Sequence, residues 1–256
     1  MLHESRLRAA IDNNVAWCGA MARAHGVATN TDRDAWWAEG TMPDYYPNAI
    51  SLTRGVEPAV VSERAREIDA LSRFDWGVKD SFAEIDLSDA GFHRLFDGTW
   101  LDALPAEGDV AADAELSALP LTWRRIEDDR SLQQWERAWG GSHAARSRRI
   151  FPASLLTDAR VHVLSASLAR DRHEIRGGAV LFVANEAVGI TNVFAKALAE
   201  SEVFTSLCTH TRGQHPATPQ VLYTSDDASL AAASRNGFSL LGPLSVWVRA
   251  PVGLRD

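Results

Sequence analysis

The sequence has few of the residues that mark several common classes of protein. Lysine occurs only as Lys79 and Lys196, and cysteine only as Cys18 and Cys208. The two cysteines lie far apart without CxxC spacing, so the sequence predicts neither a disulfide framework nor a metal site. No run approaches the ~18 apolar residues of a membrane helix, and residues 1–10 lack the apolar core of a signal peptide. We therefore expect a cytoplasmic protein without a membrane partner.

Positive charge is also in short supply. The 256 residues include 34 acidic and 26 basic side chains, and the formal net charge is −8. A protein that binds nucleic acid nonspecifically needs a basic surface, so we expect no nucleic-acid partner. Hydrophobic residues make up 46% of the chain, which is enough to build the core of one large domain or two small ones.

The first half of the chain combines helical and strand patterns. Apolar residues recur at helical spacing over residues 4–26 and 57–73, whereas strand patterns begin at Ala49 and cover residues 77–87. Residues 102–122 are rich in alanine, aspartate and proline, so we predict a linker or exposed connection there.

The second half alternates strands with helices. We predict helices at 132–141, 197–210 and 227–237, and strands at 161–168, 178–184, 187–194, 219–225 and 238–249. Asn185-Glu186 has the length of a two-residue hairpin turn. Gly242-Pro243 predicts a bulge in the last strand.

A faint internal repeat relates the two halves. Residues 78–101 and 221–248 both run from a strand through a polar segment to Gly-Phe, and then to an apolar strand that carries a tryptophan. The pairs are Gly91-Phe92 with Trp100, and Gly237-Phe238 with Trp247. Two interpretations stay open, a true duplication and ordinary turn chemistry used twice.

The element order of the second half, together with two segments, resembles the GCN5-related N-acetyltransferase (GNAT) superfamily. The segments are GAVLFVANEAVGITNVFA at 178–195 and DDASLAAASRNGF at 226–238. The resemblance covers roughly residues 155–250. It implies an α+β fold with a mixed, mostly antiparallel sheet flanked by helices. A shortened first copy would give a GNAT-like half at 1–110 and an acyltransferase domain at 120–256.

The resemblance also implies acetyl-CoA as cofactor. The strand ending at Val193-Phe194 is expected to splay from its neighbour, so that its free backbone groups pair with the pantetheine arm. The next helix would direct its N-terminus at the pyrophosphate. The implied cofactor-binding residues are Asn192, Val193, Phe194, Ala195, Lys196 and Asp226.

The phosphate loop departs from the family pattern. The family places glycine before the helix, but no glycine lies between Gly189 and Gly213. Small residues replace glycine in size but resist positive φ. Glu200 near the helix start opposes a pyrophosphate by charge. Lys196 is either a phosphate partner or a solvated loop lysine.

The catalytic residues also depart from the family pattern. Where the family often has a tyrosine acting as general acid, this chain has Ala233. Asp226 stands where the family has asparagine, and it is either a cofactor ligand or a helix N-cap. Tyr223, on the preceding strand, is interpreted as a packed strand residue rather than a displaced acid. No catalytic residue is assigned.

Two hypotheses follow for function. The first is an acyl-CoA-dependent N-acetyltransferase whose acceptor is a small-molecule or peptide amine. The second is a non-catalytic GNAT-fold protein that binds a ligand or a partner, which the missing glycine and tyrosine favour. No motif indicates a hydrolase or an oxidoreductase.

Overall fold

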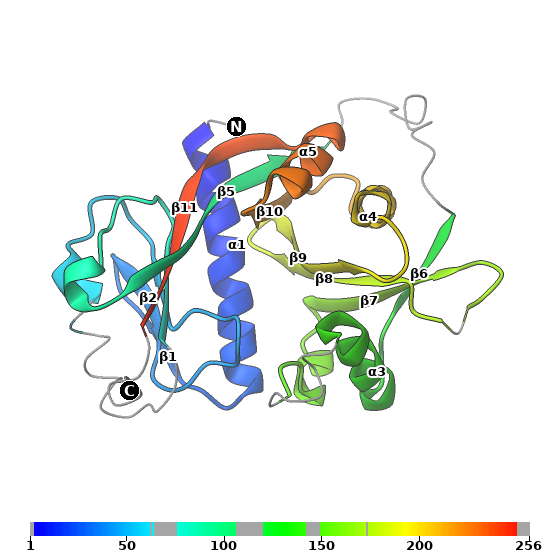
Figure 1. Ribbon diagram of the computed structural model, residues 1–256, viewed down its shortest axis with the longest axis horizontal. Coiled ribbons are helices and arrows are strands. Elements are labelled where there is room, and N and C mark those ends of the chain that lie inside the picture. Colours follow the sequence, from blue (N-terminus) through cyan, green and yellow to red (C-terminus); the bar gives the residue numbers. More distant parts are fainter. Residues whose placement is uncertain are drawn as a thin grey trace.

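The computed structural model describes residues 3–61, 63, 76–105, 120–141, 149–172 and 174–249. One large sheet is flanked by helices (Figure 1), which confirms the predicted α+β class. The helices are α1 (His3–Ala24), α3 (Asp129–Gly140), α4 (Glu200–Gln214) and α5 (Asp227–Arg235), with the short 3₁₀ helices η1 (Ser88–Ala90) and η2 (Ala153–Thr157). The strands are β1 (Thr29–Thr31), β2 (Ala35–Ala38), β3 (Ala49–Ser51), β4 (Trp76–Asp80), β5 (His93–Ala103), β6 (Leu121–Arg125), β7 (Val161–Leu168), β8 (Gly177–Ala184), β9 (Ala187–Ala195), β10 (Gln220–Thr224) and β11 (Ser239–Arg249).

The eleven strands form one continuous sheet in the order β1-β2-β3-β4-β11-β5-β10-β9-β8-β7-β6. Neighbours are antiparallel except for two parallel pairs, β3 with β4 and β9 with β10. Strand β11, the last of the C-terminal half, lies between β4 and β5 of the N-terminal half. Strand β5 in turn pairs with β10. Each half thus places its last strand beside strands of the other half.

The two Gly-Phe segments have the same local geometry. Gly91 has φ 83° and Gly237 has φ 81°, the left-handed conformation that favours glycine. In both segments the glycine amide donates to the carbonyl three residues earlier, and the phenylalanine amide donates to the carbonyl five residues earlier. Each turn leads into an 11-residue strand, β5 or β11. These two strands pair with each other at the centre of the sheet.

Helix α1 crosses the sheet at its centre (Figure 1) and packs against β5, β8, β9 and β11. The predicted helix at 4–26 is confirmed, and Gly26 follows its end with φ 71°. Asn13 fixes the helix to the β8–β9 hairpin, because its amide nitrogen donates to the carbonyls of Phe182, Ala184 and Ala187 at 3.2, 2.9 and 3.0 Å. A helix of the N-terminal half therefore covers strands of the C-terminal half.

Most of the predicted elements of the second half are present. Strand β7 has the predicted bounds, and Asn185 and Glu186 form the hairpin turn with φ 53° and 59°. The ladder between β11 and β5 shifts register between Leu240 and Gly242, which confirms the bulge. Three short strands were not predicted, β1, β2 and β6.

Two sequence predictions for connecting segments need correction. The predicted linker at 102–122 begins inside β5 and ends inside β6, because Leu101 and Ala103 are buried core residues that pair with β10. Residues 106–119 lie outside the described residues. The helix predicted at 57–73 is helical at 58–61, and most of its remainder also lies outside them.

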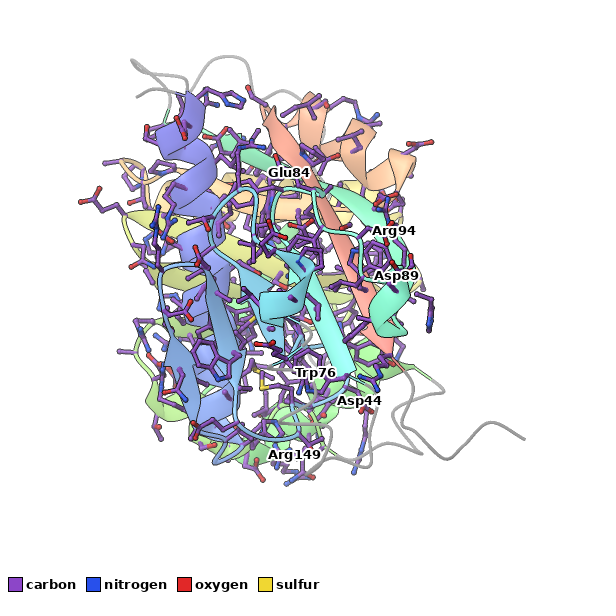
Figure 2. The ribbon with its side chains drawn as sticks, turned by 90° about the vertical axis from the view of Figure 1, so that its left-hand side faces the viewer. Asp44, Trp76, Glu84, Asp89, Arg94 and Arg149 are labelled. Carbon is purple, nitrogen blue, oxygen red and sulfur yellow. The ribbon has the colours of Figure 1, made fainter. Side chains whose placement is uncertain are left out.

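The strand predicted at 77–87 ends early, at Asp80, because this side chain binds the chain that follows it. Its carboxylate accepts hydrogen bonds from the backbone amides of Phe82, Glu84 and Ile85 at 3.1, 2.6 and 2.7 Å. It also accepts one from the Ser51 hydroxyl of β3 at 2.9 Å. These bonds fold residues 81–87 over the ends of β3 and β4. Figure 2 faces this half, with Trp76 low and Glu84 high in the view.

Candidate functional site

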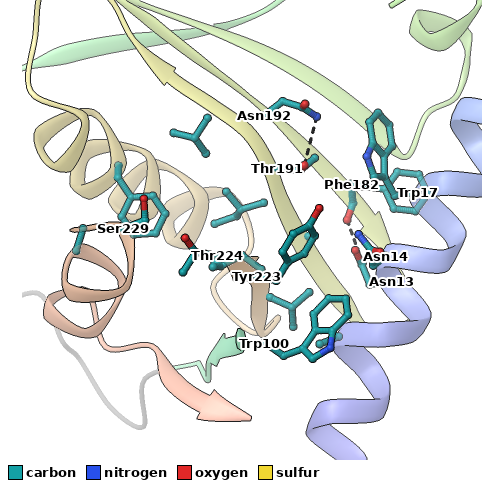
Figure 3. A pocket seen from close by; sticks show the side chains of 18 of the residues that line it. Asn13, Asn14, Trp17, Trp100, Phe182, Thr191, Asn192, Tyr223, Thr224 and Ser229 are labelled. Carbon is teal, nitrogen blue, oxygen red and sulfur yellow. Dashed lines mark hydrogen bonds between the residues drawn. The ribbon is translucent and has the colours of Figure 1, made fainter. Parts of the chain in front are cut away.

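Strands β9 and β10 separate after a short parallel contact. They pair only at Val188–Gln220 and Gly189–Val221, whereas β9 continues to pair with β8 as far as Ala195. The gap between them opens into a cavity of about 700 Å³ (Figure 3). A splayed strand of this kind presents backbone groups that an extended ligand can pair with.

The cavity has an exposed end and a buried end. Helices α4 and α5 line the exposed end through Glu200, Ala228 and Arg235. Helix α1 and strands β4 and β5 line the buried end, where five side chains are at most 3% exposed: Asn13, Trp17, Cys18, Lys79 and Trp100. Both halves of the chain therefore contribute to one cavity.

Of the cofactor residues predicted on β9 and directly after it, the structure brings two to the cavity. Asn192 and Val193 line it, whereas Phe194, Ala195 and Lys196 do not. Phe194 packs into the core with its ring centroid 5.4 Å from that of Trp135. Lys196 is exposed, and its backbone amide donates to the carbonyl of Arg176. The solvated-lysine interpretation therefore fits Lys196 better than a place in the cavity wall.

Asn192 forms a β-bulge at the cavity wall. It has φ 53°, and the β8–β9 ladder shifts register beside it. Its side-chain amide donates to the hydroxyl of Tyr46 at 3.2 Å. Burial raises the pKa of Tyr46, so this phenol stays neutral at physiological pH. The bulge directs a polar side chain of β9 into the space between the strands.

The loop before α4 holds an alanine, Ala197, in a backbone conformation that favours glycine. Ala197 has φ 55°, a left-handed conformation that costs a residue with a Cβ about 1 kcal/mol or more. Ala199 is the N-cap of α4, and its side chain forms no capping hydrogen bond. Glu200 and Ser201 of the first turn line the cavity. The geometry suits an anion at the helix N-terminus, and the charge of Glu200 opposes one.

Asp226 caps helix α5. Its carboxylate accepts the backbone amide of Ser229 at 2.8 Å, and this bond is the main reason that its pKa is lowered. Asp226 does not line the cavity. The helix-capping alternative therefore accounts for this residue.

Tyr223 stands in the middle of the cavity and is only half-buried. Figure 3 shows its ring beside Trp100 and its hydroxyl directed toward Thr191. The two rings meet edge to face, with centroids 5.3 Å apart. The interpretation of Tyr223 as a packed strand residue is thus half right, because the ring packs while the hydroxyl faces the gap.

Sequence reasoning missed the buried end of the cavity. Its residues come from α1 and from β4 and β5 of the N-terminal half, outside the segments that carried the GNAT resemblance. Two signals were available. Lys79 is one of only two lysines, and the aromatic residues Trp17, Tyr45 and Tyr46, which could form a pocket or part of the core, line this cavity. No group of three His, Cys, Asp or Glu side chains suited to a metal ion occurs among the described residues.

A scan of protein-family models finds none that matches the sequence, and a search of curated proteins finds no relative. Solved structures do match. A GCN5-related N-acetyltransferase from Kribbella flavida is 12% identical with a TM-score of 0.57, and the match covers 94% of this chain and 96% of that one. A GCN5-related N-acetyltransferase from Sphaerobacter thermophilus is 11% identical with a TM-score of 0.58, over 86% and 81%. A functionally unknown conserved protein from Staphylococcus epidermidis is 11% identical with a TM-score of 0.58, over 87% and 93%. The chain therefore has the GNAT fold that the sequence predicted.

Proposed function

We propose that the chain is an acetyl-CoA-dependent N-acetyltransferase of the GNAT superfamily, acting on a small-molecule or peptide amine. The observation that carries the proposal is the gap between β9 and β10, which opens into a cavity of about 700 Å³. In this proposal residues 120–256 form the acyltransferase domain and residues 1–110 a second, GNAT-like half. The matched turns at Gly91 and Gly237 support the duplication.

The residues around the gap fit an extended, anionic cofactor. Acetyl-CoA would supply an acyl group activated as a thioester. The free edge of β9 from Ile190 onward offers backbone groups to the pantetheine arm. The uncapped N-terminus of α4 offers amides to the pyrophosphate. Arg235 at the exposed end adds a positive charge and takes the place that the sequence gave to Lys196.

One proton-bearing group that lines the cavity is the hydroxyl of Tyr223. We propose it as the general acid in place of the tyrosine that the family carries at Ala233. Its position on β10 keeps it on the opposite side of the gap from the bulge at Asn192.

The second candidate function is non-catalytic ligand binding on the same fold. Among the described residues that line the cavity, the only carboxylate is Glu200 at the exposed end, and no histidine is present. An acetyltransferase needs a base or relay that takes a proton from the amine. A cavity whose buried end lacks a base can still bind a ligand, which supports the non-catalytic alternative.

The deciding experiment is a calorimetric titration with acetyl-CoA, followed by a mass-spectrometric screen of amines. Ala228→Trp on the cavity face of α5 should abolish binding by filling the gap. Ser234→Trp, also exposed on α5 but outside the cavity lining, is the matched control and should bind like the wild type. Binding without acetylation of any amine would favour the second function. No binding at millimolar acetyl-CoA would overturn the cofactor proposal.

The two exposed cations near the gap provide a finer test. Arg235→Gln should weaken acetyl-CoA binding about tenfold, since a charge-assisted hydrogen bond contributes roughly 1.5–3 kcal/mol. Lys196→Gln should change the affinity by less than about threefold, because Lys196 does not line the cavity. If Lys196→Gln weakens binding more than Arg235→Gln, the phosphate site lies at the loop that carries Lys196 instead.

A cytoplasmic location is part of the same proposal. Both cysteines are free and buried, which suits a reducing compartment. Within the described part of the chain, no helix is long and apolar enough to cross a membrane.

A further inference from the structure

Lys79 is a buried cation with neutral partners. Its side chain comes from β4, lines the cavity and is only 2% exposed. The ammonium donates to the side-chain oxygen of Asn14 at 2.8 Å. It lies 4.0 Å from the ring centroid of Tyr223 and 5.8 Å from that of Trp100. Among the described residues, no carboxylate forms an ion pair with it.

A buried charge without a counter-charge is costly, and proteins normally pair it. This chain does so elsewhere on the same sheet, where the carboxylate of Asp102, 1% exposed, accepts a hydrogen bond from the Nε of Arg6 at 2.7 Å. Lys79 has three donors, of which Asn14 takes one and two aromatic faces satisfy part of the charge. The remaining hydrogen-bonding capacity faces the cavity.

The groups around Lys79 supply no negative charge at neutral pH. Burial raises the pKa of the Cys18 thiol to about 11, and burial likewise raises the pKa of Tyr46. Asn13 and Asn14 are neutral amides. A ligand is therefore the source of negative charge that this end of the cavity lacks.

We propose that the buried end of the cavity binds the carboxylate of a small-molecule ligand, with Lys79 as its counter-ion and Asn14 holding the ammonium in place. One lysine matches one negative charge, which favours a carboxylate over a phosphate dianion. Four aromatic residues line this part of the cavity: Trp17, Trp100, Phe182 and Tyr223. They favour a ligand with an apolar or aromatic body. That this ligand is the acceptor amine, with its carboxylate on Lys79 and its amine toward the gap, rests on the proposed function.

The test compares an acid with its neutral amide, 3-phenylpropanoate and 3-phenylpropanamide, by calorimetric or NMR titration. The wild type should bind the acid at least about tenfold more tightly, the effect of one charge-assisted hydrogen bond in a buried site. Lys79→Met should lose this preference while still binding the amide. Lys196→Met, at the other lysine of the chain, should keep it.

Folding of the variants is checked by thermal unfolding. Lys79→Met should unfold at the same temperature as the wild type or higher, since an apolar side chain removes a buried charge without a counter-ion. Lys79→Gln is a second variant that keeps polarity and removes charge, and it should lose the preference as well. The proposal is overturned by equal wild-type affinity for acid and amide, by no binding of the acid at millimolar concentration, or by a preference that survives in both variants.

The same samples separate this inference from the proposed function. Acetyl-CoA should bind Lys79→Met as it binds the wild type, because Lys79 lies at the end of the cavity away from α4 and α5. If the wild type prefers the acid but does not bind acetyl-CoA, the transferase proposal is overturned and the carboxylate site is retained. If the wild type binds acetyl-CoA but does not prefer the acid, the carboxylate site is overturned and the transferase proposal is retained.

Discussion

Strand β3 pairs with β4, and β9 with β10, in parallel over two residues each. Beyond that contact the two pairs differ. At the end of β3 and β4, Ser51, Asp80 and Ser81 tie the strands together with hydrogen bonds between 2.7 and 2.9 Å. At the end of β9 and β10 the backbones separate around a cavity. The comparison teaches that one backbone arrangement becomes a closed core or an open cleft according to the side chains at the strand ends.

The loops that follow β3 and β9 differ in the same sense. After β3, the amide of Gly55 donates to the Glu84 carboxylate at 3.1 Å, and Glu84 also pairs with Arg54. The protein's own carboxylate thus takes the place of an anion in the N-terminal half. After β9, the N-cap Ala199 leaves the first amides of α4 without a side-chain acceptor. Of these two loops, only the one after β9 is therefore expected to bind a ligand anion.

Removing the closure of the N-terminal half should have the largest effect. Asp80→Ala leaves three backbone amides and a hydroxyl without an acceptor at a residue that is 1% exposed. We expect a loss of at least about 3 kcal/mol in the free energy of unfolding. Urea denaturation measures it. Thr224→Ala, at the end of β10, is the matched control and should cost only about 0.5 kcal/mol. Equal losses of unfolding free energy in the two variants would contradict the difference between the closed and the open strand pair.

A change at the open pair should disturb the packing of α1. A Cβ added at Gly189 would lie 2.1 Å from the side-chain oxygen of Asn13. We expect Gly189→Ala to destabilise the protein by about 2 kcal/mol through overpacking. Gly213→Ala on α4 meets no atom within 4 Å and should stabilise by about 0.5 kcal/mol. A neutral Gly189→Ala in chemical denaturation would mean that α1 does not fix the cavity wall.

Two strained alanines test the loops directly, since Ala83 and Ala197 both have φ 55°. Glycine at either position should raise stability by about 1 kcal/mol, because it removes the steric cost of the left-handed conformation. Only Ala197→Gly should also tighten acetyl-CoA binding, measured by calorimetry, because only that loop leads to the cavity. Equal effects of both variants on affinity would contradict the assignment of the phosphate loop.

The smallest expected effect concerns the helix caps. Asp226 caps α5, whereas no side-chain bond caps η1 of the N-terminal half at Leu87. The folded-state pKa of Asp226 is lowered, chiefly by the amide of Ser229. Its contribution is therefore present above the unfolded pKa of about 3.9 and is lost as pH falls through the folded pKa. Because Asp226 is largely exposed, we expect less than about 1 kcal/mol.

Thermal unfolding between pH 7 and pH 3 measures this contribution. Asp226→Asn keeps a capping oxygen and should flatten the pH dependence of stability below about pH 4. Asp227→Asn, one residue further along, serves as the control for the loss of a negative charge in the first turn. If both variants keep the wild-type slope, capping by Asp226 is not linked to its ionisation.

Local signals made much of the C-terminal half predictable. Alternation of apolar residues over 161–168 gave β7 its bounds, and the two residues between apolar runs at 185–186 gave the hairpin turn. Strands β1 and β2 were missed because runs of three and four residues carry no measurable periodicity. Of the cofactor residues predicted on β9, Val193 lines the cavity and Phe194 does not, because alternation along a strand sends them to opposite faces.

The sequence by itself determined most of the element order of the second half, the hairpin and the Gly-Phe turns, because these depend on residues close together in the chain. The GNAT fold followed from the resemblance that this order and two segments carry. Only the tertiary structure decided that β11 lies between β4 and β5 and that Lys79 and Tyr223 share one cavity. These two residues are far apart in sequence and sit on strands separated by two others. Their meeting depends on the exchange of last strands and on α1 crossing the sheet, and pairings between distant segments leave no periodic signal in a single sequence.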